Sequence, residues 1–440
     1  MANANPIANL FKIPELKEKI LFTLLALFIY RIGAHISAPG IDVSALQAQF
    51  AALGSTLFGV YDMFVGGALS RATVLSLGIM PYISASIMFQ LLAAVVPSIE
   101  KMQKEGEDGR KKLTQWTRYA TVALALAQGY GYAVFIQNIP NAVHTPGLFS
   151  FLLPTAVVLT TGAVFVMWLG EQITERGIGN GMSLLIFFSI IEVFPQAVAR
   201  TWEQLTTGVI GIFPIIVLVL VMLGVIAGVV AMTMAARKIP VQIPRKVMGR
   251  GRVREGQKSF IPLRINSSGV MPIIFAQSII ILPGTFAAFF SGSFLTGMSN
   301  LFQPGAWLYN VSYGVLILFF TYFYTSIIFN PVDLAENLKK QGAFIPGVKP
   351  GAKTADYIDY VLTRITLAGA IYLTVIALLP FFIIDAFNIQ GFLFGGTSLL
   401  IVVGVALDTV QQMQQHLLLR HYEGFMKKGR VRFRGRQRNT

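Results

Sequence analysis

The sequence lacks cysteine altogether and has little charge of either sign. Of its 440 residues, 12% are Asp, Glu, Lys or Arg, about half the share found in ordinary soluble domains. The absence of cysteine excludes disulfides, thiolate metal sites and cysteine nucleophiles. Hydrophobic residues make up 54% of the chain, and its mean hydropathy is +0.65. This composition indicates one body embedded in lipid.

Apolar runs of about 20 residues recur along the chain, and each is long enough to cross a hydrocarbon core. Backbone groups in lipid must be hydrogen-bonded within their own segment, so these runs are predicted to be helices. The sequence therefore predicts an all-α polytopic membrane protein with ten transmembrane helices. The predicted spans are 20–38, 73–96, 119–137, 151–170, 181–199, 212–236, 269–290, 308–329, 365–384 and 393–412.

The basic residues alternate with the spans. Of the 35 lysines and arginines, 32 fall in the two terminal segments and in the loops after even-numbered spans. The positive-inside rule places this side in the cytoplasm, so both termini are predicted to be cytoplasmic. A net charge of +15 would suggest nucleic acid in a soluble protein. Here it orients the spans and favours anionic lipid or acidic partners.

The two ends of the chain lie outside the predicted spans. Segment 1–19 is polar and amphipathic, has no cleavable signal peptide, and is predicted to include a short interfacial helix at 12–19. Segment 413–440 is a strongly basic tail. The tail is compatible with contact to ribosomal RNA or anionic lipid, and equally with a disordered tail that signals orientation.

Two long cytoplasmic loops, 237–266 and 330–364, differ from the other connections. The first alternates β-favouring residues with Pro and Gly, which predicts a hairpin projecting from the membrane. Topology anchoring needs only a few charges near the ends of spans. The nine basic residues in the first loop therefore favour a docking surface over a simple anchor.

The outer segment between spans one and two contains an apolar, glycine-rich stretch at 57–70, LFGVYDMFVGGALS. It is too short to cross the membrane, so it is predicted to be re-entrant and to fold into a protein-lined cavity. The alternative is an interfacial helix on the outer leaflet.

A short repeat links the two parts of the chain. Span two opens with Gly78-Ile-Met-Pro-Tyr-Ile83, and span seven opens with Gly269-Val-Met-Pro-Ile-Ile274. Each is the second span of its half if the halves are 20–199 and 200–412. Gly/Pro-interrupted helices at matching positions are typical of inverted-repeat architectures, in which the functional path runs between the halves.

No catalytic or metal-binding constellation is evident, so no cofactor and no metal are expected. The four histidines (His35, His144, His416 and His421) are not spaced as metal ligands. Ion-coupled transporters usually place carboxylates or histidines at mid-depth. The ionisable residues noted near span ends are Arg31, Glu171, Glu175, Arg176, Asp385 and Asp408. The polar residues noted at mid-span are neutral: Ser84, Ser86, Gln90, Gln128, Gln277, Ser278 and Thr325. This pattern favours a passive conduit or a scaffold over an ion-coupled pump.

Several long motifs carry a family resemblance. They are MFVGGALSRATVLSLGIMPYISASI (63–87), KEGEDGRKKLTQWTRYAT (104–121), MWLGEQITERGIGNGMSLLIF (167–187), FNPVDLAENLKKQGAFIPGVKPGAKT (329–354) and GGTSLLIVVGVALDTVQQ (395–412). By these motifs the sequence resembles the SecY family, the central subunit of the bacterial protein-conducting channel, from about residue 12 to about residue 425.

The resemblance implies ten helices in two pseudo-symmetric inverted halves around a central pore. It implies a pore ring formed by Ile79, Ile83, Met182, Ile186, Ile274 and Ile401. Met182 departs from the branched residue usual in the family, and its flexible side chain is expected to seal more leakily. The implied plug is about 57–71, including Phe64, Gly66, Gly67, Ser70 and Arg71. The implied lateral gate toward lipid lies between spans two and three and spans seven and eight, lined by Ser84, Gln90, Gln128 and Leu282.

The resemblance also implies a function and partners. The function is to translocate unfolded secretory polypeptides and to release hydrophobic segments laterally. The protein would be no enzyme, because the energy comes from the SecA ATPase, the ribosome or the proton-motive force. The implied partners are SecE, SecG, SecA, the ribosome, signal sequences and preproteins, in the bacterial inner membrane. The implied docking residues are Arg245, Lys246, Arg250, Arg252, Arg254, Lys339, Lys340 and Lys349, the last standing where the family usually has Arg. Lysine keeps the charge there but loses the bidentate fork of arginine.

Two other classes of function remain open from the residues alone. A secondary transporter for a small solute shares the span count and the inverted repeat, but it predicts a charged site at mid-membrane. A membrane scaffold without a conduit leaves the re-entrant segment and the nine-charge loop without a role.

Overall fold

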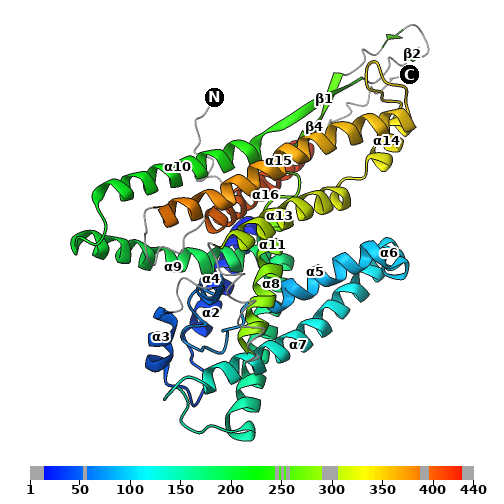
Figure 1. The fold of residues 1–440 in the computed structure, drawn as a ribbon. Helices are drawn as coiled ribbons and strands as arrows, with labels where there is room; N and C mark the ends of the chain where they lie inside the picture. Colours follow the sequence, from blue (N-terminus) through cyan, green and yellow to red (C-terminus); the bar gives the residue numbers. More distant parts are fainter. Residues whose placement is uncertain are drawn as a thin grey trace.

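The computed structural model describes residues 14–52, 57–242, 247–248, 252–253, 258–289, 306–386 and 396–428. Long helices dominate, and a thin β-hairpin projects beyond the end of one group of them (Figure 1). The elements of the first half are α2 (Pro14–Gly33), α3 (Val43–Ala52), α4 (Leu57–Phe64), α5 (Met80–Val95), α6 (Pro97–Lys104), α7 (Glu107–Gln137), the π-helix η1 (Leu148–Leu152), α8 (Leu153–Arg176) and α9 (Gly181–Thr206).

The second half begins with another long apolar helix. Its elements are α10 (Ile212–Met234), β1 (Ala236–Gln242), β2 (Val247–Met248), β3 (Arg252–Val253), β4 (Lys258–Arg264), α11 (Met271–Phe289), α13 (Trp307–Ile328), α14 (Pro331–Lys340), α15 (Ala352–Ala386) and α16 (Gly396–Lys428).

Each of the ten predicted spans falls on a helix, which confirms the all-α polytopic class. In the described part of the chain, seven helices are long and apolar enough to cross a membrane, and α5 with α6 forms an eighth that is bent by 108°. The bend has a local cause, because Val96 is extended (φ −101°) before Pro97. The two remaining spans lie on α2, which begins with charged residues, and on the shorter apolar stretch of α11.

Several helices extend beyond the predicted spans. Helix α2 runs without a break from Pro14 to Gly33, so residues 14–19 extend the first span and form no separate interfacial helix. Helix α15 begins at Ala352, within the predicted loop 330–364, and α16 continues to Lys428, within the predicted tail. Hydropathy marks where lipid begins and ends, whereas a helix continues as long as its residues favour it.

The short repeat has the same local structure in both halves. Gly78 and Gly269 have positive φ angles, +54° and +62°. In the first turn of α5, Ile83 N–H donates to the carbonyl of the residue after Gly78, at 3.1 Å, and in α11 Ile274 N–H does the same after Gly269, at 3.2 Å. A proline follows within the first two helical positions, where its missing N–H costs nothing. The repeat is therefore a matched pair of turn-and-helix starts.

The two long loops fold together. Strands β1 and β4 pair antiparallel from Ala236–Arg264 to Gln242–Lys258, which confirms the predicted hairpin. Gln242 and Phe344 then exchange backbone hydrogen bonds of 2.9 and 3.0 Å, which join the hairpin to the second loop. A small separate core lies between them, formed by Ile239, Val241, Leu263, Leu338, Ala343, Ile345, Ile358 and Val361. We call this unit (β1, β4, α14 and residues 341–351) the platform.

Candidate functional site

The six candidate ring residues come from the beginnings of α5 and α9, including the cap residue Ile79 just before α5, and from α11 and α16. The five isoleucines, Ile79, Ile83, Ile186, Ile274 and Ile401, are at most 5% exposed and belong to one hydrophobic cluster. Met182 is partly buried and packs against the same cluster. Its sulfur lies next to Gly170 of α8, since a Cβ at Gly170 would collide with it. The structure thus places residues that are up to about 320 positions apart in the sequence in the same large buried apolar cluster.

Helix α4 is an eight-residue apolar helix enclosed by the bundle. Seven of its eight residues are buried, and it packs against α9 and α11 between the two groups of helices (Figure 1). The Ser398 hydroxyl of α16 lies 3.4 Å from the sulfur of Met63 in α4. This burial agrees with the re-entrant prediction and disfavours the interfacial alternative, in which one face of the helix would meet lipid.

A tight turn follows α4 and contains the other candidate plug residues. Phe64, 3% exposed, ends the helix. Gly66 and Gly67 have φ angles of +72° and +74°, a region that glycine adopts at little cost. The turn closes on Asp62, whose carbonyl accepts from Gly67 N–H at 2.8 Å and whose Oδ1 accepts from Ser70 N–H at 2.9 Å. Backbone groups that α4 leaves unsatisfied are thereby paired within the protein.

A small cavity of about 20 Å³ lies between the plug segment and the helices of the candidate gate. Three of the four predicted gate residues line it: Ser84 from α5, Gln128 from α7 and Leu282 from α11. Tyr61 of α4 also lines it. The Gln128 amide oxygen is buried and has no hydrogen-bond partner among the described residues. The cavity therefore combines an apolar lining with a polar group that is free to bond.

Comparison with known proteins decides the family. A sequence model of the SecY family matches residues 73–410. The chain belongs to the SecY family. It is 46% identical over 429 residues to the protein translocase subunit SecY of Escherichia coli strain K12, covering 96% of each chain. It is 45% identical over 426 residues to the subunit of that name from Aquifex aeolicus strain VF5, covering 95% of this chain and 98% of the relative.

Solved structures share the fold of this SecY-family chain. One described as the structure of a protein conducting channel covers 94% of this chain and 97% of its own, with a TM-score of 0.67 and 18% identity. Sec61 in a canine ribosome–channel complex covers the same shares, with a TM-score of 0.62 and 16% identity. At these identities the likeness shows a shared fold.

The fourth gate candidate of the SecY-family chain, Gln90, lies elsewhere along the same seam. Its side-chain oxygen accepts a 2.6 Å hydrogen bond from the Tyr324 hydroxyl, which joins α5 to α13. Its amide nitrogen donates to Ser86 at 3.0 Å. Farther along the seam, the Ser278 hydroxyl lies 3.9 Å from the sulfur of Met80. Sequence reasoning missed Tyr324, because a tyrosine within an apolar run carries no signal of its partner.

The candidate docking residues are only partly described. Lys339, Lys340 and Lys349 are exposed on the platform. Lys340 forms a long ion pair of 3.8 Å with Glu336, one turn earlier on α14. The side chains of the other five candidates, Arg245, Lys246, Arg250, Arg252 and Arg254, lie outside the described residues.

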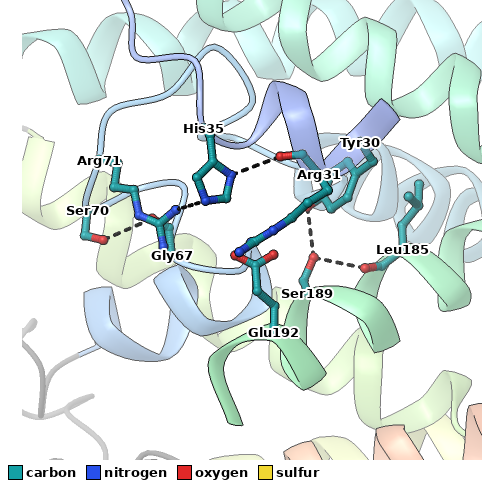
Figure 2. A network of polar contacts seen from close by, with 9 residues as sticks. All are labelled: Tyr30, Arg31, His35, Gly67, Ser70, Arg71, Leu185, Ser189 and Glu192. Atoms are coloured by element: carbon teal, nitrogen blue, oxygen red, sulfur yellow. Dashed lines mark hydrogen bonds and ion pairs between the residues drawn. The ribbon is translucent and has the colours of Figure 1, made fainter. Parts of the chain in front are cut away.

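The structure corrects the statement that mid-span polar groups are neutral. Glu192 lies in the middle of α9, 7% exposed, and forms an ion pair with Arg31 of α2. On the plug side of this pair, Arg71 donates to His35 at 2.9 Å (Figure 2). Glu192 is the sole ionisable residue in the predicted span 181–199, and intramembrane charges pair with one another. Because Arg31 also lies within a predicted span, the tendency of intramembrane charges to pair could have predicted that it meets Glu192.

The mid-span carboxylate does not restore an ion-coupling site. Glu192 is paired with a cation of the protein itself, which occupies the position that a transported cation would need. Among the described residues, no group of three or more His, Asp or Glu is placed to hold a metal ion.

Proposed function

We propose that this chain is the pore-forming subunit of a protein translocase, which passes unfolded secretory polypeptides across the membrane and releases hydrophobic segments sideways into lipid. One observation carries the proposal: a short apolar helix is enclosed in the bundle, packed against α9 and α11, which carry three of the candidate ring residues. Relatives at 45–46% identity bear the name protein translocase subunit. A small-solute transporter has no use for such a removable internal helix.

The candidate ring acts as a gasket around a passing chain. Branched apolar side chains change rotamer at little cost, and they offer no fixed hydrogen-bond pattern that would select one peptide sequence over another. When no chain is present, the same ring closes into a dry constriction that opposes ion flow. Sealing and lack of sequence preference thus follow from one property, the absence of polar atoms at the narrowest point.

The segment 57–71 acts as the plug. In its seated position it adds a second barrier of buried apolar side chains next to the ring. It lies between α3 and α5 in the chain and belongs to neither helix, so it can leave without unfolding either one. Displacement exposes apolar surface, at roughly 25 cal/mol for each Å², and an entering chain can replace the contacts that are lost.

The seam of α5 and α7 against α11 and α13 acts as the lateral gate. A signal sequence is an apolar helix, so it gains free energy in lipid, whereas the polar chain behind it stays in the pore. Among the described residues, the polar contacts across the seam include a hydrogen bond from Tyr324 to Gln90 and the Ser278–Met80 contact. Each such bond contributes about 1 kcal/mol, which suits a seam that opens and closes.

The chain supplies a path, and partners supply the energy. We assign the supply of energy to the SecA motor, the ribosome and the proton-motive force. SecE and SecG are the proposed companion subunits. A solved structure of similar fold is Sec61 in a ribosome–channel complex, which supports a ribosome as one partner. The protein would lie in the bacterial inner membrane with both termini in the cytoplasm, as its basic loops favour.

The platform is the proposed docking surface. Its hairpin extends away from the helices (Figure 1), and it carries exposed lysines on a core of its own. Replacing Lys339, Lys340 and Lys349 with glutamate should lower ribosome affinity by about tenfold or more at low salt, because basic contacts to phosphate release counterions. The loss should shrink as salt screens the charges. Co-sedimentation of reconstituted vesicles with ribosomes at two salt concentrations measures it.

A matched control reverses three exposed charges elsewhere on the same predicted side of the membrane. Arg110, Lys111 and Lys112 lie at the start of α7 and are exposed. Their replacement with glutamate should change ribosome affinity by less than about threefold, since the loss predicted for the platform is a local one. An equal loss in both variants would mean that net charge alone matters, and the platform would then be a topology anchor.

Reconstitution tests the function itself. The full chain is placed in vesicles with SecE and SecG, and SecA, ATP and a preprotein are added outside. Preprotein that crosses becomes protected from added protease, and detergent removes the protection. Vesicles without the chain, and vesicles with the chain but without ATP, serve as controls. Absence of protected preprotein where a known channel works rejects the proposed function.

A further inference from the structure

A polar network joins the plug turn to two helices from opposite sides (Figure 2). From α2, the Tyr30 hydroxyl pairs with the Ser189 hydroxyl of α9 at 2.9 Å. Arg31, the next residue, forms the ion pair with Glu192, one turn after Ser189. These contacts fix α2 against α9 with one hydroxyl pair and one charge pair.

The plug turn rests directly on this junction. A Cβ added at Gly66 would lie 3.2 Å from Glu192 Oε2 and 3.4 Å from the Ser189 backbone. The absence of a side chain at Gly66 is therefore what allows the turn to approach α9 so closely. The charge pair Arg31–Glu192 therefore lies beside the turn.

The far end of the plug turn is held by a histidine. Arg71 Nη1 lies 2.9 Å from His35 Nε2, and His35 Nδ1 lies 3.0 Å from the carbonyl of Arg31. Arginine has only donors, so Nε2 accepts and Nδ1 carries the proton that is donated to the carbonyl. The imidazole thus bridges the plug to the same residue that pairs with Glu192.

Burial explains why these groups act together. Glu192 is 7% exposed and Arg31 is 33% exposed. A carboxylate withdrawn from water is stable only when it is paired, and loss of one partner leaves an uncompensated buried charge. Arg71 and Arg31 repel each other, and His35 and Glu192 separate them. At this junction Glu192 pairs with one arginine and His35 accepts from the other.

We propose that Arg31, His35 and Glu192 form a seat that positions the Gly66–Arg71 turn of the plug, and that Glu192 and His35 set how readily the plug leaves. The proposal rests on the proposed function, in which segment 57–71 moves during transport. Glu192 and His35 are positioning residues, since neither lies in the isoleucine ring. The ring seals by apolar contact, whereas the seat sets the threshold for opening.

A single introduced cysteine can report the position of the plug, because the chain has none of its own. Val60 of α4 is 3% exposed, so Val60→Cys is shielded while the plug is seated and reacts with a membrane-impermeant maleimide when it is displaced. In the full chain reconstituted with SecE and SecG, Glu192→Gln should raise the reaction rate about tenfold, which corresponds to about 1.4 kcal/mol. Glu192→Asp, which keeps the charge, should restore most of the shielding.

His35 provides a second variant that does not depend on a buried residue. It is exposed, so His35→Ala leaves no core cavity. The maleimide reaction rate should rise several-fold in His35→Ala. It should rise less in His35→Gln, which retains a hydrogen-bond acceptor. Glu203→Gln is the matched control, because Glu203 is exposed on the same helix α9. It should leave the rate unchanged.

The outcomes separate the seat from the function. Equal rates for Glu192→Gln, Glu192→Asp and Glu203→Gln, together with no effect of His35→Ala, overturn the seat. The same rise for Glu192→Gln and Glu192→Asp assigns Glu192 to packing and also overturns it. Preprotein transport by the parent chain is measured in the same vesicles. Its absence, with the reactivity pattern intact, rejects the function and leaves the seat standing.

Discussion

Ile401→Asn should make the resting channel leak ions and accept preproteins with defective signal sequences. Ile401 is fully buried in the apolar cluster that also contains Ile83, Ile186 and Ile274. An asparagine there places an amide that holds water at the constriction, and dewetting is what opposes ion flow. Burying an unpaired amide costs about 1–3 kcal/mol, and about 1.4 kcal/mol is a tenfold change in an equilibrium. The population of the closed state relative to the open state should therefore fall about tenfold or more.

Two measurements check this prediction. Ion flux into vesicles without any preprotein reports the seal, and the protected fraction of a preprotein with a weakened signal sequence reports selectivity. Val410→Asn is the matched control, because Val410 lies on the same helix α16 and is 42% exposed. It should leave both values at the parental level. Parental leak and selectivity in Ile401→Asn would show that Ile401 is not part of the ring.

A covalent link across the seam should stop transport at its first step. Met80→Cys and Ser278→Cys place two thiols on α5 and α11, where the parental side chains are 3.9 Å apart. A short bismaleimide that joins them keeps the helices together. A signal helix with its side chains is about 10–12 Å across, so it cannot pass between them. Protected preprotein should fall about tenfold or more, close to the level without ATP.

The design has a control within one half of the molecule. Arg118 of α7 and Glu171 of α8 are joined by two hydrogen bonds of 2.9 and 2.8 Å, and both helices belong to the first half. Cross-linking Arg118→Cys to Glu171→Cys should leave transport largely intact, since these helices need not separate. The single-cysteine variants of the seam test the reagent itself. Full transport through the linked seam would show that the path out of the pore lies elsewhere.

The membrane character of the fold could be predicted well because the bilayer acts on each segment separately. Twenty apolar residues must form a helix wherever they stand, and each predicted span falls on one. The ends were predicted less well, since α15 and α16 continue past the apolar part of their sequence. The ring positions came from family resemblance, and the cluster that contains them was not evident from hydropathy.

The candidate site shows the same division. The sequence shows that the apolar stretch 57–70 is too short to cross the membrane, and its glycines Gly66 and Gly67 indicate the turn that follows α4. Its burial against α9 and α11 required the tertiary structure. The platform is similar, because the hairpin was predictable from local alternation, whereas its bond to Phe344 of the next loop was not.

The sequence by itself determined the ten apolar segments, the grouping of the basic residues in alternate loops, and the short apolar segment 57–70 that we propose as part of the plug. These features depend on the transfer of single segments between water and lipid, which composition specifies. Only the tertiary structure decided which charges meet. Tyr30 and Ser189 are 159 residues apart in the chain, and the neighbouring pair Arg31–Glu192 is equally remote. Such pairs form where the packing of apolar helices brings polar groups together out of water, and no local pattern records that packing.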